Sequence, residues 1–207
     1  MKRVVLDLGC GSSFQIIEIL KDSLDAWIIG VDWDFSFCRK SKERAREHGV
    51  DAEYVCCDAG LLPFQDEIFD VIYALDSLRC LKGHQPQQFI KEAYKKLRHG
   101  AEMHIAGLDK VSFRRKDLPV FKDLSLPFNW SSYIPQNGSS PFISEEPSEK
   151  ELNVYRRHKY VGILKEKTVR EFLWQCYLEP ESTWETKKEG AFTYHFYTIT
   201  ARKSASN

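Results

Sequence analysis

Short apolar stretches alternate with longer amphipathic stretches through the first half of the chain. Apolar and β-branched residues are concentrated in segments that we expect to be strands, at 3–8, 26–31, 51–57, 69–74 and 101–107. Periodic apolar positions between them predict helices at 35–48 and 86–98, and a shorter one after Ser12, which is placed to cap it. Strands that alternate with helices in this way predict an α/β fold with a parallel sheet covered on both faces.

This alternation stops after the fifth expected strand. The segment from about 109 to 163 is rich in proline and aromatic residues and has no clear period, so we predict a lid-like insertion there. After it, 167–177 is expected to be a helix, with Thr168 and Glu171 as a capping box. The last two strands are predicted at 181–188 and 191–203, as a hairpin around Gly190. The 207 residues suit a single domain, 1–207.

Charge and cysteine content exclude several classes of protein. The chain has 30 basic and 30 acidic residues, so no net field directs it to nucleic acid or to an anionic membrane. Its six cysteines show neither a CxxC pair nor a metal-like spacing, so we predict no metal site. No apolar run is long enough to span a membrane, and Asp7 interrupts the first run, which is therefore no signal peptide. We expect a cytoplasmic protein with reduced thiols.

Acidic residues recur where the first three expected strands end. Asp7, Asp32 and Asp58 lie at or near these ends, one strand–helix unit apart. Ligands of such sheets bind outside the carboxyl ends of the strands, near the point where the strand order reverses. The three acids are therefore expected to form one site, although any one of them alone could simply cap the next helix.

The segment VVLDLGCGSSF, residues 4–14, places an acid before a glycine turn. A dinucleotide would bring a pyrophosphate, which prefers the G-x-G-x-x-G fingerprint, but Phe14 stands at the third glycine and Asp7 adds negative charge. S-adenosylmethionine has no phosphate and carries a sulfonium and an ammonium group, both of which an acid attracts. The turn therefore favours a cofactor with a cationic tail and argues against a dehydrogenase.

At these residues the sequence resembles the class I S-adenosylmethionine-dependent methyltransferases, and in particular the small-molecule enzymes of the methyltransferase type 11 group. Their first motif, an acid followed by x-Gly-x-Gly-x-Gly, is matched by residues 7–13, with Ser13 in place of the third glycine. The resemblance implies that Asp32 holds the ribose hydroxyls and that Asp58 and Ala59 bind the adenine edge. Trp33, next to Asp32, could pack on the adenine or be a half-buried packing residue. The cofactor-binding residues it implies are Asp7, Gly9, Cys10, Gly11, Asp32, Trp33, Asp58, Ala59 and Ala74.

The resemblance covers about residues 3–108 and 164–202, and it also implies a topology. The family has a Rossmann-like, doubly wound sheet of seven strands in the order 3-2-1-4-5-7-6, with the last strand antiparallel. Members usually carry helices before the first strand. Because a strand is expected almost at once in this sequence, the site is expected to be more open, or to be covered by the insertion or by a partner.

Methyl transfer is a direct displacement, so a strong base is optional and alignment of the nucleophile is essential. Asp76 and His84, just past strand four, and Tyr73, near its end, are the candidates for catalytic residues; each could equally be a cap or packing residue. Small-molecule members often have a histidine where this chain has Arg79 and Cys80, so no catalytic histidine follows from the resemblance.

The acceptor is expected to be a small organic molecule bound under the aromatic insertion. Residues 74–77, Ala-Leu-Asp-Ser, lack the Asn/Asp-Pro-Pro-aromatic motif of many base-modifying members, so methylation of a nucleic-acid base is not favoured. The basic groups at 114–116 and 156–159 leave RNA or protein as an alternative substrate, with a partner chain or a homo-oligomer. The other alternative to a small-molecule methyltransferase is a non-catalytic binding subunit.

Overall fold

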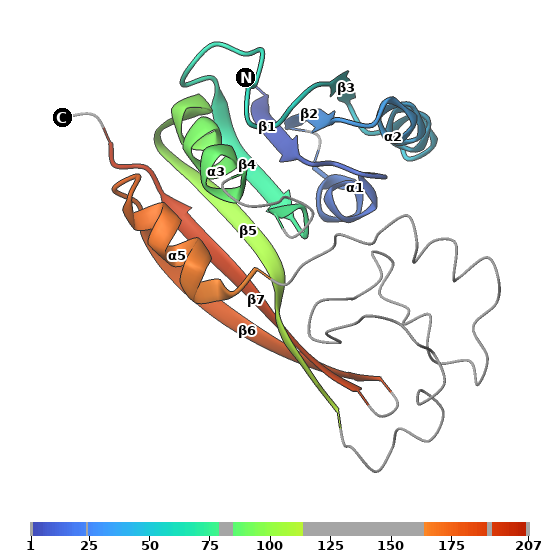
Figure 1. The fold of residues 1–207 in the computed structure, drawn as a ribbon. Helices are drawn as coiled ribbons and strands as arrows, with labels where there is room; N and C mark the ends of the chain where they lie inside the picture. Colours follow the sequence, from blue (N-terminus) through green and yellow to red (C-terminus); the bar gives the residue numbers. More distant parts are fainter. Residues whose placement is uncertain (1, 24, 79–84, 114–163, 190–191, 206–207) are drawn as a thin grey trace.

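The structure is a computed structural model, and it describes residues 2–23, 25–78, 85–113, 164–189 and 192–205. Its seven-stranded sheet has the order β3-β2-β1-β4-β5-β7-β6 (Figure 1). The strands β1 to β5 run parallel, and β7 is antiparallel to both of its neighbours, β5 and β6. This topology confirms the predicted fold class. The strands are β1 (Arg3–Leu8), β2 (Ala26–Asp32), β3 (Ala52–Cys56), β4 (Phe69–Leu75), β5 (Leu97–Phe113), β6 (Glu179–Glu189) and β7 (Phe192–Arg202).

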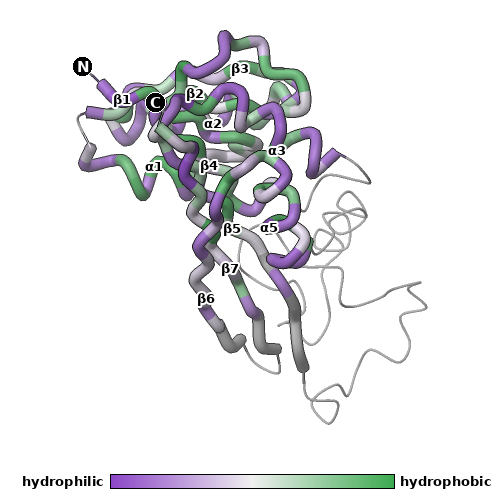
Figure 2. Tube along the Cα trace, turned by 90° about the vertical axis from the view of Figure 1, so that its left-hand side faces the viewer, coloured by the Kyte–Doolittle hydropathy of each residue, from purple (hydrophilic) through white to green (hydrophobic). Residues whose placement is uncertain are grey.

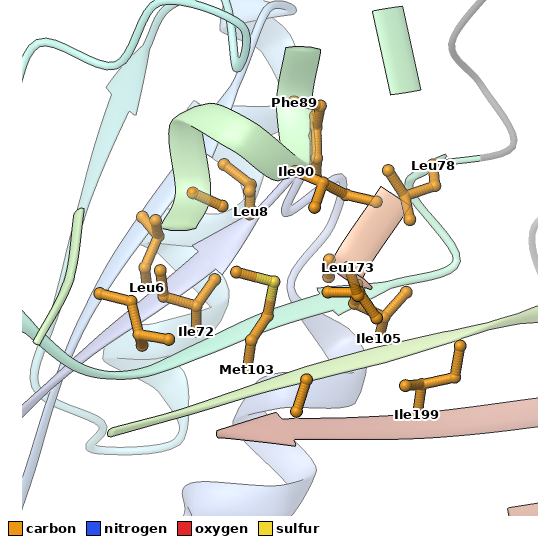
Figure 3. Packing of buried hydrophobic residues seen from close by; sticks show 14 of the residues in the cluster. Leu6, Leu8, Ile72, Leu78, Phe89, Ile90, Met103, Ile105, Leu173 and Ile199 are labelled. Atoms are coloured by element: carbon orange, nitrogen blue, oxygen red, sulfur yellow. The ribbon is translucent and has the colours of Figure 1, made fainter. Parts of the chain in front are cut away.

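Helices cover both faces of the sheet, as the alternating pattern predicts. The helices α1 (Phe14–Leu20) and α2 (Phe35–Glu47) lie on one face, and α3 (Gln85–Lys96) and α5 (Glu166–Trp174) lie on the other (Figure 1). The larger core lies under α3 and α5, where Phe89, Ile90 and Leu173 pack on apolar side chains of the central strands (Figure 3). Hydrophobic segments are concentrated in these central strands, whereas the edge strand β6 is mainly hydrophilic (Figure 2).

The helix ends differ from the sequence predictions at two places. The cap of α1 is Ser13 rather than Ser12, and its side chain makes no capping hydrogen bond. Helix α5 begins at Glu166, so the predicted capping box of Thr168 and Glu171 is wrong. The acceptor for the first turn of α5 is instead the Asp109 carboxylate, which receives the Glu166 N–H at 3.1 Å. Asp109 lies on β5, far away in the sequence, and this is why the pattern of α5 could not reveal it.

The strands β5, β6 and β7 extend beyond the rest of the sheet (Figure 1). Strand β5 continues to Phe113, past its predicted end at 107, and pairs with β7 along this length. Residues 114–163 lie outside the described part, so the lid-like insertion stays a prediction. None of the helices in the described ranges is long and apolar enough to cross a bilayer.

The end of β7 is fixed by a buried lysine. The Lys203 side chain donates to the backbone oxygens of Leu97 and Tyr94, at 2.8 and 3.3 Å, and to the Glu67 carboxylate at 3.1 Å. Its ammonium group also lies 4.6 Å from the centre of the Tyr94 ring. These contacts join the segment after β7 to the end of α3 and the start of β5, so they hold the outer strands against the rest of the domain.

Candidate functional site

The turn after β1 is built by two glycines in the left-handed conformation. Gly9 and Gly11 have φ of 73° and 50°, a region that L side chains rarely adopt. A Cβ atom on Gly9 would lie 2.5 Å from the Cβ of Ser77, so only glycine fits against the residues that follow β4. A Cβ atom on Gly11 would meet nothing within 4 Å. Beside the turn there is therefore no free space at Gly9, whereas there is free space at Gly11.

Asp32, the last residue of β2, stabilises this turn through hydrogen bonds. Its Oδ2 accepts the Gly11 N–H at 2.9 Å and its Oδ1 accepts the Asp34 N–H at 3.0 Å. Burial raises the pKa of this carboxyl, while the backbone hydrogen bonds counteract the shift. Each carboxylate oxygen has a second lone pair. Asp32 can therefore hold the turn and still accept two ligand hydroxyls, as a ribose would require.

Asp7 lies in β1, just before the same turn, and is 4% exposed. Its Oδ2 accepts the hydroxyl of Ser13 at 2.8 Å. Burial raises the pKa of Asp7 to about 7, the Ser13 hydrogen bond opposes this shift, and the charge of Asp32 adds to it. When Asp7 is ionised, two neighbouring carboxylates at a glycine turn repel a pyrophosphate and attract a cationic group, so the geometry supports the electrostatic argument made from the sequence.

The rim of the site carries large exposed apolar side chains. Trp33 is 80% exposed, Phe35 70% and Leu61 76%, so Trp33 is not a packing residue of the core. Asp58, which is exposed, accepts the Gly60 N–H at 2.8 Å and so shapes the loop after β3 that includes Ala59. These side chains follow β2 and β3 at one edge of the sheet, where a flat heterocycle could stack on them.

Two of the expected cofactor residues can act only through their backbone. Ala74 is buried, and its side chain packs in the core under α3. The Cys10 thiol is buried as well, and burial raises its pKa, so it behaves as a small apolar group and not as a nucleophile. Their assignment to cofactor binding stays a prediction that concerns backbone groups.

The candidate catalytic residues are in different positions. Asp76 directly follows β4 with a φ of 61°, and its N–H donates to the Ala106 oxygen at 2.8 Å, so it lies at the same sheet edge as the glycine turn. Tyr73 lies within β4, half-buried, with its ring stacked on His104 at a centroid distance of 5.0 Å. His84 lies outside the described residues. Of the two candidates that the structure describes, only Asp76 lies at the carboxyl edge.

Sequence reasoning missed Ser77, which lies beside the turn. Ser77 packs on Gly9, and its buried hydroxyl has no hydrogen-bond partner within the described ranges. The contact joins residues that are far apart in the sequence, and no local pattern marks it. An unpartnered buried hydroxyl is uncommon in native proteins, so its place at this turn is consistent with a ligand site.

The fold and the site together define a nucleoside-binding α/β protein of the Rossmann-like type. The strand order reverses between β1 and β4, and both the glycine turn and Asp32 lie at the carboxyl edge beside that point. The open side of Gly11, the free lone pairs of Asp32 and the paired acids suit a nucleoside with a cationic tail.

Comparisons with known proteins agree with this class. Residues 5–100 match the family model described as a methyltransferase domain. The chain is 31% identical over 160 residues to 27-O-demethylrifamycin SV methyltransferase of Amycolatopsis mediterranei (strain S699), covering 70% of this chain and 57% of that protein. It is 26% identical over 145 residues to the mitochondrial 2-methoxy-6-polyprenyl-1,4-benzoquinol methylase of Leishmania donovani, covering 69% and 46%. The chain thus spans about half the length of these relatives.

Solved structures share the fold. A SAM-dependent methyltransferase from Methanosarcina mazei has a TM-score of 0.66 and 19% identity, covering 98% of this chain and 93% of that one. The [4+2]-cyclase SpnF has a TM-score of 0.65 and 18% identity, covering 99% and 76%. The chain belongs to the class I S-adenosylmethionine-dependent methyltransferase family. S-adenosylmethionine is the cofactor of that family.

Proposed function

We propose that this protein transfers a methyl group from S-adenosylmethionine to a small organic acceptor by direct displacement. The observation that carries the proposal is the pair of buried acids, Asp7 and Asp32, on either side of the turn formed by Gly9 and Gly11. This arrangement suits a nucleoside whose other end is positively charged. The match to the methyltransferase family supports the same cofactor.

Each part of the cofactor has residues placed to hold it. Asp32 accepts the two ribose hydroxyls with the lone pairs that its backbone contacts leave free. Asp58 and the backbone of Ala59 bind the adenine edge, and Trp33 covers the ring. The backbone around Gly9, Cys10 and Gly11, with Asp7 behind it, receives the amino-acid end, and the backbone of Ala74 completes this part of the site.

The cofactor supplies an activated methyl group on a sulfonium, so the protein needs to align a nucleophile and exclude water. Asp76 is the residue best placed to orient an acceptor hydroxyl or amine and to hold its proton, because it lies at the carboxyl edge after β4. Tyr73 lies within the sheet, so any effect that it has on the acceptor acts through the packing of β4. His84 remains a sequence-based candidate.

The acceptor class rests on the motif after β4 and on the names of the relatives. One relative is named for a demethylrifamycin and another for a polyprenyl benzoquinol, both small organic molecules. The sequence at 74–77 does not favour a nucleic-acid base.

The described cysteines are all free, which supports the cytoplasmic location expected from composition.

A second function is a protein that binds the cofactor but does not transfer its methyl group. The observation in its favour is that some proteins similar to this chain bear other names. SpnF is a [4+2]-cyclase, and a protein from Campylobacter jejuni subsp. jejuni serotype O:23/36 (strain 81-176), 28% identical over 93 residues, is a carboxy-S-adenosyl-L-methionine synthase. A partner chain or a homo-oligomer would be compatible with either function.

Transfer of a labelled methyl group tests the proposal. The protein would be incubated with methyl-labelled S-adenosylmethionine and, separately, with a panel of phenols, enols and amines, with RNA, and with a protein extract. We expect label in a solvent-extractable small molecule, loss of transfer in Asp32→Ala, and retention in Asp70→Asn, an acid at the opposite end of β4 that contacts Val4 and Arg98. Label in RNA or protein alone would contradict the small-molecule acceptor. Cofactor binding without transfer to any acceptor would support the second function.

A further inference from the structure

Ser13 stands where the family motif has its third glycine, and its conformation calls for an explanation. Its φ is 48°, which is uncommon for a residue with a side chain and which glycine adopts without strain. Its hydroxyl does not cap helix α1 but donates to Asp7 Oδ2 at 2.8 Å. The side chain therefore serves the buried acid and not the helix.

A second hydroxyl, that of Tyr54, lies near the same pair. Asp7, Gly30 and Tyr54 lie in one row across β1, β2 and β3, because Asp7 pairs with Gly30 and Gly30 pairs with Tyr54. The Tyr54 ring lies over Gly30, since a Cβ atom there would be only 2.4 Å from two ring carbons. The missing side chain of Gly30 thus lets a residue of β3 extend across β2 toward Asp7.

The Tyr54 hydroxyl is buried and has no hydrogen bond of regular geometry. Burial raises its pKa, and both the Ser13 hydroxyl and the Asp7 charge lie near enough to perturb it as well. Within the described part of the chain, only Tyr54 and Ser77 have a buried side-chain oxygen without a partner. Tyr54 contacts Gly30, which pairs with Asp7, and Ser77 contacts Gly9, two residues after Asp7.

We propose that Ser13 and Tyr54 are positioning residues that fix the carboxylate of Asp7 for the ammonium end of the cofactor. Ser13 holds Oδ2, so Oδ1 is left for the ligand. Tyr54, lying across Gly30, donates its hydroxyl to Ser13 Oγ when the cofactor is bound, and this orients the Ser13 hydroxyl toward Asp7. The inference rests on the proposed function, because it assigns these residues to one end of the same cofactor.

Binding of two ligands, one with the amino-acid tail and one without it, distinguishes a positioning role of Ser13 and Tyr54 from a purely structural one. S-adenosylhomocysteine carries the amino-acid tail, whereas 5′-methylthioadenosine has the adenine, ribose and sulfur but no tail. The variants are Ser13→Gly, which removes the hydroxyl and tolerates the backbone conformation, and Tyr54→Phe, which keeps the ring on Gly30. Tyr177→Phe, at a tyrosine that is 88% exposed after α5, is the matched control.

Calorimetric titration of the full chain gives the affinities. We expect Ser13→Gly to weaken binding of S-adenosylhomocysteine about tenfold and Tyr54→Phe about threefold, consistent with the loss of one charged and one neutral hydrogen bond. Binding of 5′-methylthioadenosine should stay unchanged in both variants and in Tyr177→Phe. The double variant should bind no more weakly than Ser13→Gly, because Tyr54 acts through Ser13.

The outcomes test the positioning role of Ser13 and Tyr54 separately from the proposed function. If the unaltered protein binds S-adenosylhomocysteine and both variants bind it equally well, the positioning role is wrong and the proposed function stands. Equal losses for the two ligands would also overturn the role, because they would show a general disturbance of the turn. If the unaltered protein binds neither ligand, both the proposed function and the inference fail.

Discussion

Replacement of Asp7 by asparagine is expected to stabilise the ligand-free protein at neutral and alkaline pH. Asp7 is fully buried, and burial raises the pKa of its carboxyl from 3.8 to about 7. An acid with a raised pKa in the folded state favours folding only while it stays protonated. Stability from this group is present below pH 3.8 and is lost as the pH rises to about 7. Asparagine keeps an acceptor for Ser13 and has no proton to lose.

The size of the change in unfolding free energy follows from the shift in the pKa of Asp7. A change from 3.8 to about 7 is worth about 4 kcal/mol in total, at about 1.4 kcal/mol for each pH unit. Roughly 3 kcal/mol of this falls between about pH 5 and 8, because the group titrates to completion near pH 7. Over that interval, the wild-type protein should lose about 3 kcal/mol of unfolding free energy relative to Asp7→Asn.

Urea unfolding at a series of pH values measures this difference directly. The same variant should bind S-adenosylhomocysteine at least tenfold more weakly, because it loses the charge that attracts the ammonium group. A gain in stability that accompanies a loss of affinity is typical of a functional site. A free-energy difference between the two proteins that stays constant from about pH 5 to 8 would refute the assignment of the raised pKa to Asp7.

Three further substitutions test the packing that supports the site, each by urea unfolding. Gly30→Ala places a methyl group 2.4 Å from the Tyr54 ring and should cost about 1–3 kcal/mol; an unchanged midpoint would show that the ring has room to move. Lys203→Met leaves buried acceptors unpaired and should cost about 2 kcal/mol, whereas a gain would mean that the lysine is not an anchor. Tyr197→Phe removes the hydrogen bond to the Leu164 oxygen, 3.0 Å long, and should cost about 1 kcal/mol; no loss would contradict its role in holding the chain before α5.

Much of the fold could be predicted because its signals are local. Alternation of apolar strands with amphipathic helices predicts the parallel part of the sheet, and Gly49 marks the end of α2, with a φ of 65°. The acid that ends β2 is also readable, since Asp32 follows a continuous apolar run. The order of the strands depended on the resemblance to a known family.

The remaining features arise from contacts between distant residues. The contact of Ser77 with Gly9, the cap that Asp109 gives α5 and the Tyr54 ring over Gly30 all join separate elements. Phe14, an apolar residue at the start of α1, is 57% exposed and lies under the Arg44 guanidinium of α2. Such contacts depend on how the elements pack, which the periodicity of a single segment does not contain.

Cofactor binding is the central claim, and one titration tests it most directly. Calorimetry of the unaltered protein, Asp32→Ala and Asp70→Asn with S-adenosylhomocysteine, with NADH as the comparison ligand, addresses both the cofactor and its anchor. We predict that S-adenosylhomocysteine binds to the unaltered protein and to Asp70→Asn, that Asp32→Ala is folded but does not bind it, and that NADH does not bind. Binding of NADH in preference to S-adenosylhomocysteine, or undiminished binding of S-adenosylhomocysteine by Asp32→Ala, would contradict the account.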